Sequence, residues 1–309
     1  MTTRVLTDES FAAHAVPEGH PERPDRIRAV WKALEGVAGI DRGGAPPCEE
    51  SLLRLAHPKA YIDSIRDARP VTGLVQLDGD TWMSPGAWEA ACRAVGGAAA
   101  AVDAVMAGRA DNAFVASRPP GHHAERSKAM GFCLFSTIAI AARHAQRRWG
   151  LERVAIVDFD VHHGNGTQDV VWDDPSILYC STHQMPLYPG TGDAGETGAG
   201  NILNVPLDPG SDGEAMRAAY RDVVLPRLDA FEPELLLLSA GFDAHVNDPL
   251  AQLRWTGEDF GWLSAQLMDR ADRLCGGRLV SLLEGGYDLA GLTEGVRAHL
   301  AALSGQATE

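Results

Sequence analysis

Residues 235–243 read Leu-Leu-Leu-Leu-Ser-Ala-Gly-Phe-Asp, an apolar run that ends in a glycine and the carboxylate of Asp243. A continuous apolar run of this length is typical of a strand buried on both faces, as in a parallel sheet between two layers of helices. Ligands of such sheets bind beyond the carboxyl ends of the strands. The stretch therefore predicts a buried strand with a functional carboxylate just after it.

Similar short apolar runs alternate with longer helical patterns along the chain, without an internal repeat or a low-complexity linker. This alternation indicates an open parallel sheet with helices on both faces. We therefore predict one α/β domain over residues 1–309. Strands are expected at 4–6, 113–117, 153–159, 177–180, 202–205, 234–239 and 278–283, and helices at 24–34, 58–66, 85–107, 134–149, 211–228, 256–274 and 289–303.

The composition is that of a folded globular protein, with 45% hydrophobic and 22% charged residues. The net charge of −15 argues against direct nucleic-acid binding, which needs a basic surface. No apolar run is long enough to cross a membrane, and no signal peptide is visible. Five cysteines without a Cys-x-x-Cys pair do not resemble a disulfide framework. We therefore expect a cytoplasmic protein without a membrane partner.

Polar residues gather directly after five of the expected strands. They are 118–123, 158–165, His183, Asp243 and 284–287. Because the carboxyl ends of parallel strands lie at one edge of the sheet, we expect these residues to form one site.

The segment 157–166, Val-Asp-Phe-Asp-Val-His-His-Gly-Asn-Gly, predicts a metal site. Side chains alternate along an extended chain, so Asp158, Asp160 and His162 point to one side. Buried ionisable groups are costly unless they are paired or bind a metal. Asp160 and His162 can supply two ligands, and Asp243 is the natural third, which leaves an open position for water. The alternative is a hydrogen-bonded strand end without a metal.

Two further features suit acid–base and oxyanion chemistry. His122 and His123 follow Arg-Pro-Pro-Gly in a restrained turn, and histidine exchanges protons near neutral pH, so one of them is a candidate general base. Asp158 and Asn165 are available to orient the two rings. Tyr287 follows two glycines after the last strand, and its hydroxyl can donate to a developing oxyanion.

At these residues the sequence resembles the histone deacetylase superfamily, including the class II-like bacterial histone deacetylase-like amidohydrolases and the acetylpolyamine amidohydrolases. The resemblance implies the arginase-deacetylase fold, with about eight parallel strands, and a metal-dependent hydrolase acting on linear amides. The matching stretches cover nearly the whole chain: HPERPDRI (20–27), RPPGHHA (118–124), GFC (131–133), VDFDVHHGNGTQ (157–168), STHQMPLYPGTGD (181–193), LSAGFDAH (238–245), DPL (248–250) and LLEGGYDL (282–289).

The resemblance implies which residues bind the metal and which carry the chemistry. One catalytic Zn²⁺ is expected, bound by Asp160, His162 and Asp243. The catalytic residues are expected to be His123 as general base and acid, His122 as its electrostatic neighbour, Tyr287 as oxyanion donor, Asp158 as the partner of His122, and Asn165.

Further residues are implied for the substrate and for a second ion. The acyl-lysine channel is expected to be lined by Gly131, Phe132, Tyr188, Leu250 and Asp80. A structural K⁺ is expected at Asp158, Asp160, His162 and Ser181. Arg23 matches an arginine of an internal channel. Asn165 stands where class I members have aspartate; asparagine is a class II feature and leaves His123 less basic than a carboxylate would.

Several alternatives stay open at this point. A ureohydrolase shares the fold but binds two Mn²⁺ through D-A-H-x-D, whose last aspartate is Gly164 here. A non-catalytic protein that binds acylated ligands would need neither His123 nor Tyr287. An apolar Leu250 and a short loop at 184–200 favour acyl-lysine over an acetylpolyamine. The metal is Zn²⁺ or Fe²⁺, since both suit two carboxylates and a histidine. The sequence is also compatible with a homo-oligomer. His163 is expected to have a structural role. His183 follows an expected strand, and the sequence leaves open whether it lies beside the metal or away from it.

Overall fold

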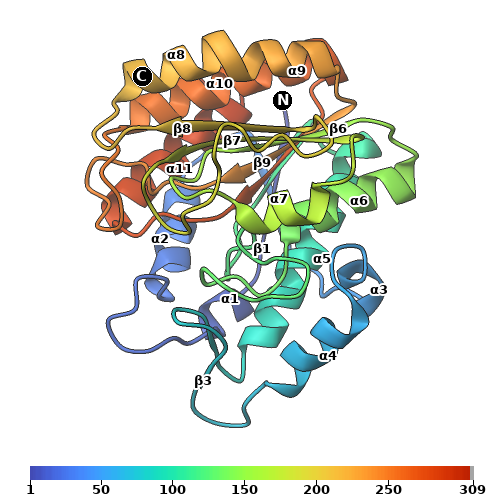
Figure 1. Cartoon of the computed structure of the whole chain (residues 1–309), viewed down its shortest axis with the longest axis vertical. Coiled ribbons are helices and arrows are strands. Elements are labelled where there is room, and N and C mark those ends of the chain that lie inside the picture. Colours follow the sequence, from blue (N-terminus) through green and yellow to red (C-terminus); the bar gives the residue numbers. More distant parts are fainter. Residues whose placement is uncertain (307–309) are drawn as a thin grey trace.

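All strands of the main sheet run parallel, in the order β2-β1-β5-β10-β9-β6-β7-β8 (Figure 1). The computed structural model describes residues 1–306. The predicted eight-stranded parallel sheet is confirmed. Its strands are β1 (Thr3–Thr7), β2 (Ile40–Gly44), β5 (Asn112–Val115), β6 (Val154–Asp158), β7 (Ile177–Gln184), β8 (Ile202–Leu207), β9 (Leu235–Ala240) and β10 (Leu279–Leu283). A short antiparallel pair, β3 (Val75–Gln76) and β4 (Trp82–Met83), lies outside this sheet.

The centre of the sheet is buried on both faces. Every residue of β6, β9 and β10 is buried, which explains why these strands are apolar without alternation. The edge strand β2 is partly or fully exposed along its length. Its sequence, Ile-Asp-Arg-Gly-Gly, contains one apolar residue, so the hydrophobic pattern did not reveal it.

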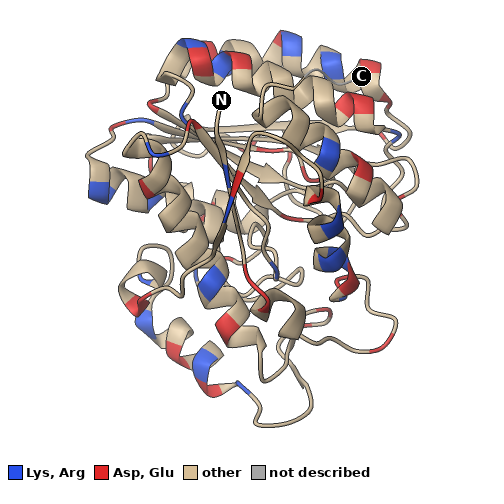
Figure 2. Ribbon diagram, turned by 180° about the vertical axis from the view of Figure 1, so that it is seen from behind, with Lys and Arg blue, Asp and Glu red and all other residues tan. Residues whose placement is uncertain are grey.

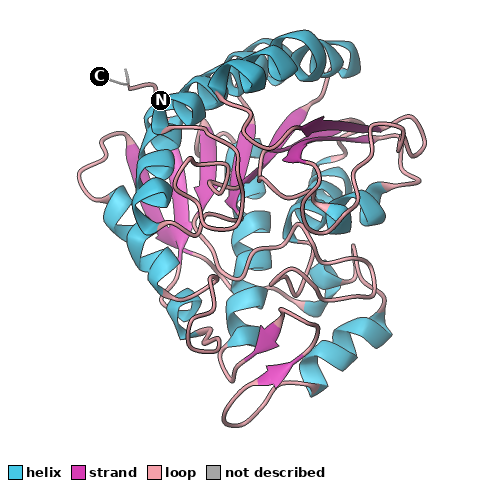
Figure 3. Ribbon diagram, turned by 60° about the vertical axis from the view of Figure 1, so that its left-hand side comes forward, coloured by secondary structure: helices cyan, strands magenta, loops and turns pink. Residues whose placement is uncertain are grey.

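Helices cover both faces of the sheet (Figures 1 and 3). One face carries α5 (Ala87–Met106), α6 (Thr137–Trp149) and α7 (Asn165–Val171). The other carries α2 (Asp25–Leu34), α8 (Gly213–Ala219), α9 (Leu225–Phe231), α10 (Gly257–Cys275) and α11 (Leu289–Leu303). The remaining helices, α1 (Ser10–Ala13), α3 (Glu50–Leu53) and α4 (Lys59–Asp67), lie with β3 at the lower end of the view in Figure 1, around α5.

One expected helix is interrupted. The sequence predicted a continuous helix over 211–228, but a π-helical turn at Tyr220–Val224 separates α8 from α9. Pro226 lies in the first turn of α9, where its missing N–H is tolerated, whereas in a helix interior it would leave a carbonyl without a donor. The interruption therefore follows from the proline.

The distribution of charged side chains on the surface agrees with the absence of a basic binding surface expected from the net negative charge of the sequence. Along the helices on the side shown in Figure 2, Lys and Arg alternate with Asp and Glu, so positive charge there is spread between acidic residues. Over residues 1–306, no helix combines the length and the apolar character that a membrane span requires.

Candidate active site

Three potential metal ligands meet beyond the carboxyl ends of β6 and β9. Asp160 and His162 follow β6, Asp243 follows β9, and one ligand atom from each lies within 4.8 Å of the others. Nδ1 of His162 is 3.0 Å from Oδ1 of Asp160 and 3.2 Å from Oδ2 of Asp243. All three residues are buried. The structure thus brings together the set that the sequence assigned to the metal.

The surroundings of this triad fit a cation. Oδ2 of Asp243 is buried and accepts no hydrogen bond, although Oδ1 accepts one from Val161 N–H at 2.9 Å. Gly285 lies against the carboxylates, and a Cβ at this glycine would come within 1.9 Å of Oδ2 of Asp243. The glycine therefore keeps the space beside the carboxylates free, and this oxygen is available as a metal ligand.

The electrostatics of the triad also favour positive charge. Burial and the neighbouring Asp160 raise the pKa of Asp243 to about 7. Burial by itself would lower the pKa of His162, but the close contacts of this ring with Asp160 and Asp243 outweigh burial and raise this pKa to about 10. Two buried carboxylates repel one another, and a divalent cation removes that repulsion.

The first histidine of the turn after β5 is paired with a carboxylate. Nδ1 of His122 lies 3.1 Å from Oδ2 of Asp158, so this nitrogen carries the hydrogen and donates. The hydroxyl of Tyr179 also donates to Asp158, at 3.0 Å. Burial would lower the pKa of His122, but Asp160 and Asp158 raise it to about 10. The ring is therefore held in its charged form beside the triad.

The second histidine has a neutral partner. Nδ1 of His123 lies 2.8 Å from Oδ1 of Asn165, and Nδ2 of Asn165 donates to Oε1 of Glu125 at 2.8 Å. Glu125 thus fixes the orientation of the amide, so Nδ1 of His123 is the donor and Nε2 is left free to accept a proton. Burial, with the charges on His122 and His162, lowers the pKa of His123 well below its usual value.

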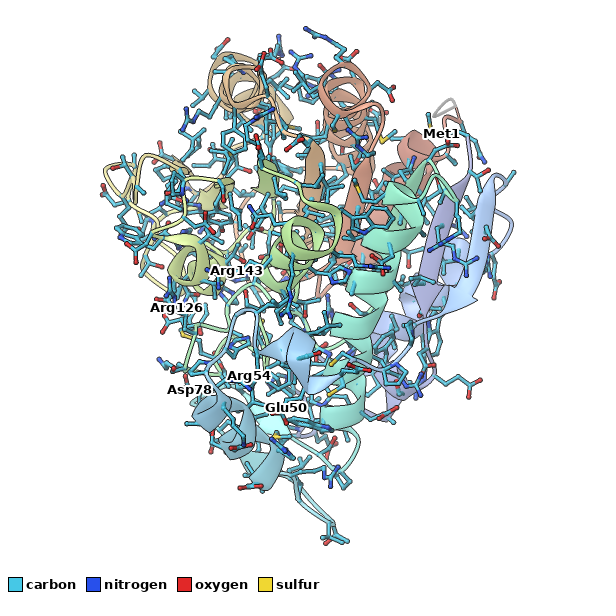
Figure 4. All side chains as sticks on the ribbon, turned by 90° about the vertical axis from the view of Figure 1, so that its right-hand side faces the viewer. Met1, Glu50, Arg54, Asp78, Arg126 and Arg143 are labelled. Carbon is cyan, nitrogen blue, oxygen red and sulfur yellow. The ribbon has the colours of Figure 1, made fainter. Side chains whose placement is uncertain are left out.

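Asn165 is positioned by α7, whose last turn is fixed by two arginines that Figure 4 labels. Nε of Arg126 donates to the carbonyl oxygen of Asp169 at 2.9 Å. Nη2 of Arg143 donates to the carbonyl oxygen of Val170 at 2.7 Å. Cationic side chains at the end of a helix pair its unsatisfied carbonyls and complement its dipole. These contacts hold the helix that presents Asn165 to His123.

Tyr287 is held from two sides. Its backbone N–H donates to Oδ2 of Asp248 at 2.7 Å, and Oδ1 of Asp248 accepts a hydrogen bond from Leu250 N–H at 3.0 Å. The guanidinium of Arg26 lies 4.8 Å from the centre of the Tyr287 ring. Arg26 is fully buried and also donates to the carbonyl oxygen of Gly286 at 2.6 Å. The tyrosine is therefore fixed in both backbone and ring.

These side chains open into one narrow cavity of about 190 Å³. Every residue that the sequence assigned to the channel lies in its wall. The lining consists of Asp80, His123, Gly131, Phe132, His162, Leu187, Tyr188, Leu250 and Tyr287. A larger groove, of about 810 Å³, runs between α2 and α11, but its lining of exposed charged residues and small apolar ones contains none of the site residues.

Aromatic rings and a glycine shape the channel. The rings of Phe132 and Tyr287 pack edge to face with centroids 5.8 Å apart, and those of Tyr188 and His123 with centroids 5.2 Å apart. A Cβ at Gly131 would lie 2.3 Å from Cδ2 of His123, so only glycine permits this approach, and its φ of 56° is one that glycine tolerates best. The result is a slot lined by rings that ends at the triad.

Comparison with known proteins agrees with this geometry. The histone deacetylase domain matches residues 20–303. The chain belongs to the histone deacetylase family. It is 44% identical over 282 residues to the histone deacetylase-like amidohydrolase of Pseudomonas aeruginosa, an alignment that covers 88% of this chain and 73% of that protein. It is 39% identical over 312 residues to the chloroplastic histone deacetylase 10 of Oryza sativa subsp. japonica, covering 94% and 70%. The crystal structure of the HDA15 HD domain superposes with a TM-score of 0.93 at 35% identity, covering 100% of this chain and 90% of that chain.

The chain is therefore a hydrolytic deacetylase, in a family whose members generally depend on a metal. The ureohydrolase alternative falls with this result. At Gly164, the position of that family's last aspartate, a Cβ would lie 2.3 Å from Oδ2 of Asp158, so a side chain there would displace the buried partner of His122. Within residues 1–306, only the one triad brings three potential ligands together.

One expectation from the sequence needs correction, and one alternative that the sequence left open is decided. Arg23 is not buried: its side chain is half exposed and lies 3.5 Å from Asp25. Arg26, three residues further on and inside α2, is the buried arginine. His183 lies inside β7, which extends to Gln184, and hydrogen bonds Ser181 and the carbonyl oxygen of Gly192 rather than the triad. The longer β7 was missed because polar residues occupy its last four positions.

The remaining expected residues fall near one another. Ser181 pairs with Asp158 in the register of β6 and β7, which places this residue of the predicted K⁺ site within β7, beside the carboxyl end of β6. Nδ1 and Nε2 of His163 pair with Thr191 and Gln168, as expected of a structural residue. Sequence reasoning did not assign Glu125, Asp248 or Arg26. Asp248 was visible in the DPL motif, but nothing in the sequence tied it to Tyr287.

Proposed function

We propose that this deacetylase removes acetyl or other short acyl groups from the lysine side-chain amine of proteins or peptides, with one Zn²⁺ bound by Asp160, His162 and Asp243. One observation carries the proposal. A single cavity of about 190 Å³ is lined by a metal ligand, His162, by a histidine with a free Nε2, His123, and by the Tyr287 ring. These are the parts that hydrolysis of an amide by water requires.

The ligand set supports a catalytic rather than a structural metal. Two carboxylates and one imidazole leave a coordination position for water. Once bound, the ion polarises the acyl carbonyl and lowers the pKa of its water. Fe²⁺ has the same ligand preferences, and the metal content of the purified protein decides between the two.

The chain's own residues handle the protons and the charge. Nε2 of His123 accepts the proton of the attacking water, because Nδ1 is committed to Asn165. The same nitrogen then delivers the proton to the leaving amine. The hydroxyl of Tyr287 donates to the oxyanion, and the positive charge of His122 adds to its stabilisation. The products are the free amine and the carboxylate.

The channel supports an acyl-lysine substrate. Phe132, Tyr188, Leu187 and Leu250 line its wall, which suits the four methylenes of a lysine side chain better than a polycation. An acetylpolyamine is the alternative substrate. A polycation would need carboxylates along the wall, and among the lining residues Asp80 is the one carboxylate.

The first experiment strips the enzyme of metal and reconstitutes it with Zn²⁺ or Fe²⁺. Hydrolysis of an acetyl-lysine peptide is then compared with that of acetylputrescine and acetylspermidine. We expect Zn²⁺-restored cleavage of the peptide with little on the polyamines. The control is Tyr287→Phe, for which we expect kcat to fall about 100- to 1,000-fold with little change in KM. Polyamine preference, or undiminished turnover by the variant, would refute the substrate or the role of Tyr287.

Three further proposals stay predictions from the sequence: homo-oligomers, a cytoplasmic location, and a structural K⁺ bound by Asp158, Asp160, His162 and Ser181. The K⁺ site is tested by unfolding the protein in KCl and in LiCl at equal ionic strength. A bound K⁺ raises the melting temperature in KCl, because an ion that binds only the folded state stabilises it. Equal melting temperatures in the two salts would remove the K⁺ proposal.

A further inference from the structure

Glu284 is a buried carboxylate that the proposed chemistry does not use. It is 1% exposed and follows directly after β10. Oε2 accepts hydrogen bonds from the backbone N–H groups of Gly121, at 2.6 Å, and of His122, at 3.2 Å. Oε1 accepts one from the hydroxyl of Ser239 at 3.1 Å. These three donors are neutral, so hydrogen bonds rather than an ion pair hold the side chain in this direction.

Those donors belong to two different parts of the site. Gly121 and His122 lie in the turn that carries both histidines, immediately before His123. One oxygen that accepts from two consecutive N–H groups fixes the two peptide groups that lead into His122, and so restrains the backbone that carries both histidines. Ser239 lies in β9, opposite Asp158 of β6, and Asp243 follows the same strand. Glu284 thus joins the histidine turn to the strand ends that carry the metal ligands.

The backbone of Glu284 is also fixed. Its N–H donates to the carbonyl oxygen of Ala240 at 2.9 Å. Its carbonyl oxygen accepts a hydrogen bond from Nη2 of Arg26 at 2.5 Å, and Arg26 is paired with Glu22 at 3.0 Å. The side chain therefore extends from a rigid base toward the histidine turn.

The charge of this group and its reach can be separated. Burial raises the pKa of Glu284 to about 7, although the charge of His122 opposes this rise, so the negative charge is costly here. A glutamine has the same length and can satisfy the same partners. Its oxygen accepts from the two N–H groups, and its nitrogen donates to the hydroxyl of Ser239, which can act as an acceptor.

We propose that Glu284 is a positioning residue. It fixes the position of the turn of His122 and His123 relative to the metal ligands, and it does so through hydrogen bonds rather than through its charge. This inference rests on the proposed function. It predicts that reach matters and charge does not, because an error of about 1 Å in the placement of a catalytic group can cost about 100-fold in rate.

Three substitutions test the two properties one at a time. Glu284→Gln keeps the reach and removes the charge, Glu284→Asp keeps the charge and shortens the reach, and Glu284→Leu removes both. The control is Asp259→Leu, at another buried carboxylate, which caps α10 away from the channel. Kinetics on the acetyl-lysine peptide are measured for each, with bound metal and melting temperature.

We expect kcat of Glu284→Gln to stay within about threefold of the wild type, and kcat of the Asp and Leu variants to fall about 100-fold with KM nearly unchanged. The control is expected to lose stability but keep its kcat. Amide hydrogen exchange gives a readout that does not depend on turnover. The N–H groups of Gly121 and His122 should stay protected in the Gln variant and exchange faster in the Asp variant.

The proposal is overturned if Glu284→Asp keeps the wild-type kcat, or if Glu284→Gln falls as far as Glu284→Leu, because the charge would then be what matters. Glu284→Asp retains a carboxylate, so the test stands even if the Leu variant does not fold. If the wild type cleaves no acylated amide, the proposed function fails. The exchange measurement would still show whether Glu284 holds the turn.

Discussion

Nδ1 of His123 lies 2.8 Å from the amide oxygen of Asn165, so the ring's hydrogen-bond partner at this nitrogen carries no charge. A carboxylate in that place would stabilise the imidazolium form and raise the pKa of His123. We expect Asn165→Asp to move the acidic limb of the pH profile of kcat/KM to higher pH, by about one unit, since the base form would be lost at a higher pH. The profile is measured between pH 5 and 10.

Glu125 complicates this substitution and provides its control. Oε1 of Glu125 accepts a hydrogen bond from the Asn165 amide at 2.8 Å, so an aspartate at 165 would face a second carboxylate. The two would share a proton, which weakens the effect on His123. The double variant Asn165→Asp with Glu125→Gln should therefore shift the limb further than Asn165→Asp alone. An equal profile in all three proteins would show that the partner of His123 does not set its pKa.

Asp248 fastens the backbone of Tyr287, and both of its oxygens are used. Asp248→Asn can accept with only one of its two side-chain atoms, so we expect kcat to fall about tenfold; Asp248→Ala leaves every donor unpaired and should cost about 100-fold. A fully buried N–H left unpaired costs about 1–3 kcal/mol in the free energy of unfolding, and these N–H groups are partly buried, so we expect a loss near the lower end of that range. The control is Asp288→Ala, which removes only the cap of α11 and should lower stability with little effect on kcat. Full kcat in Asp248→Ala would contradict the role.

The strands and the ligands were predictable for the same physical reason. A buried parallel strand must be apolar, so a carboxylate just after one, such as Asp243 or Asp160, stands out in the sequence. The edge strand Ile40–Gly44 escaped notice because exposure on one side removes that requirement. The short helix α7 begins with Asn-Gly and gave no helical signal. Its arginine contacts come from segments far away in the sequence.

Residues that support the site were harder to predict. Asp248 binds backbone N–H groups that any residue could offer, and Glu125 meets the side chain of Asn165 from 40 residues away, so no spacing in the sequence points to either. The internal arginine was misplaced by three positions. Arg23 precedes α2 and Arg26 lies in its first turn, and which of the two faces the interior depends on packing that the motif alone does not fix. Side chains that meet a metal carry a chemical pattern, whereas those that hold a backbone do not.

Metal binding by the triad is testable apart from catalysis. We expect Zn²⁺ to raise the melting temperature of the metal-free wild type but not of Asp243→Asn, because a ligand that binds only the folded state stabilises it. Since burial and Asp160 raise the pKa of Asp243 to about 7, its charge opposes folding at pH 8 when no metal is bound. The metal-free variant should therefore be at least as stable as the metal-free wild type. A variant that still gains stability from Zn²⁺ would remove Asp243 from the ligand set.

The last prediction concerns His299, a buried histidine away from the active site whose titration should make the free energy of unfolding depend on pH. Ser264 donates its hydroxyl proton to the carbonyl oxygen of Phe260 at 2.6 Å, so Nδ1 of His299, 2.7 Å away, must donate to Ser264. Nε2 then accepts from the hydroxyl of Ser281 at 2.9 Å, and the buried ring is neutral. Burial lowers the pKa of His299 from 6.5 to about 3.

The unfolded chain therefore binds a proton at His299 between pH 6.5 and about 3 that the folded chain does not. The contribution of this residue is complete above pH 6.5 and is lost as the pH falls, by about 2 kcal/mol at pH 5. His299→Gln keeps one donor and one acceptor but does not titrate. Urea unfolding at pH 8 and pH 5 should show a smaller loss of stability for this variant than for the wild type, by about that amount. Parallel losses in the two proteins would mean that His299 takes up its proton in the folded state.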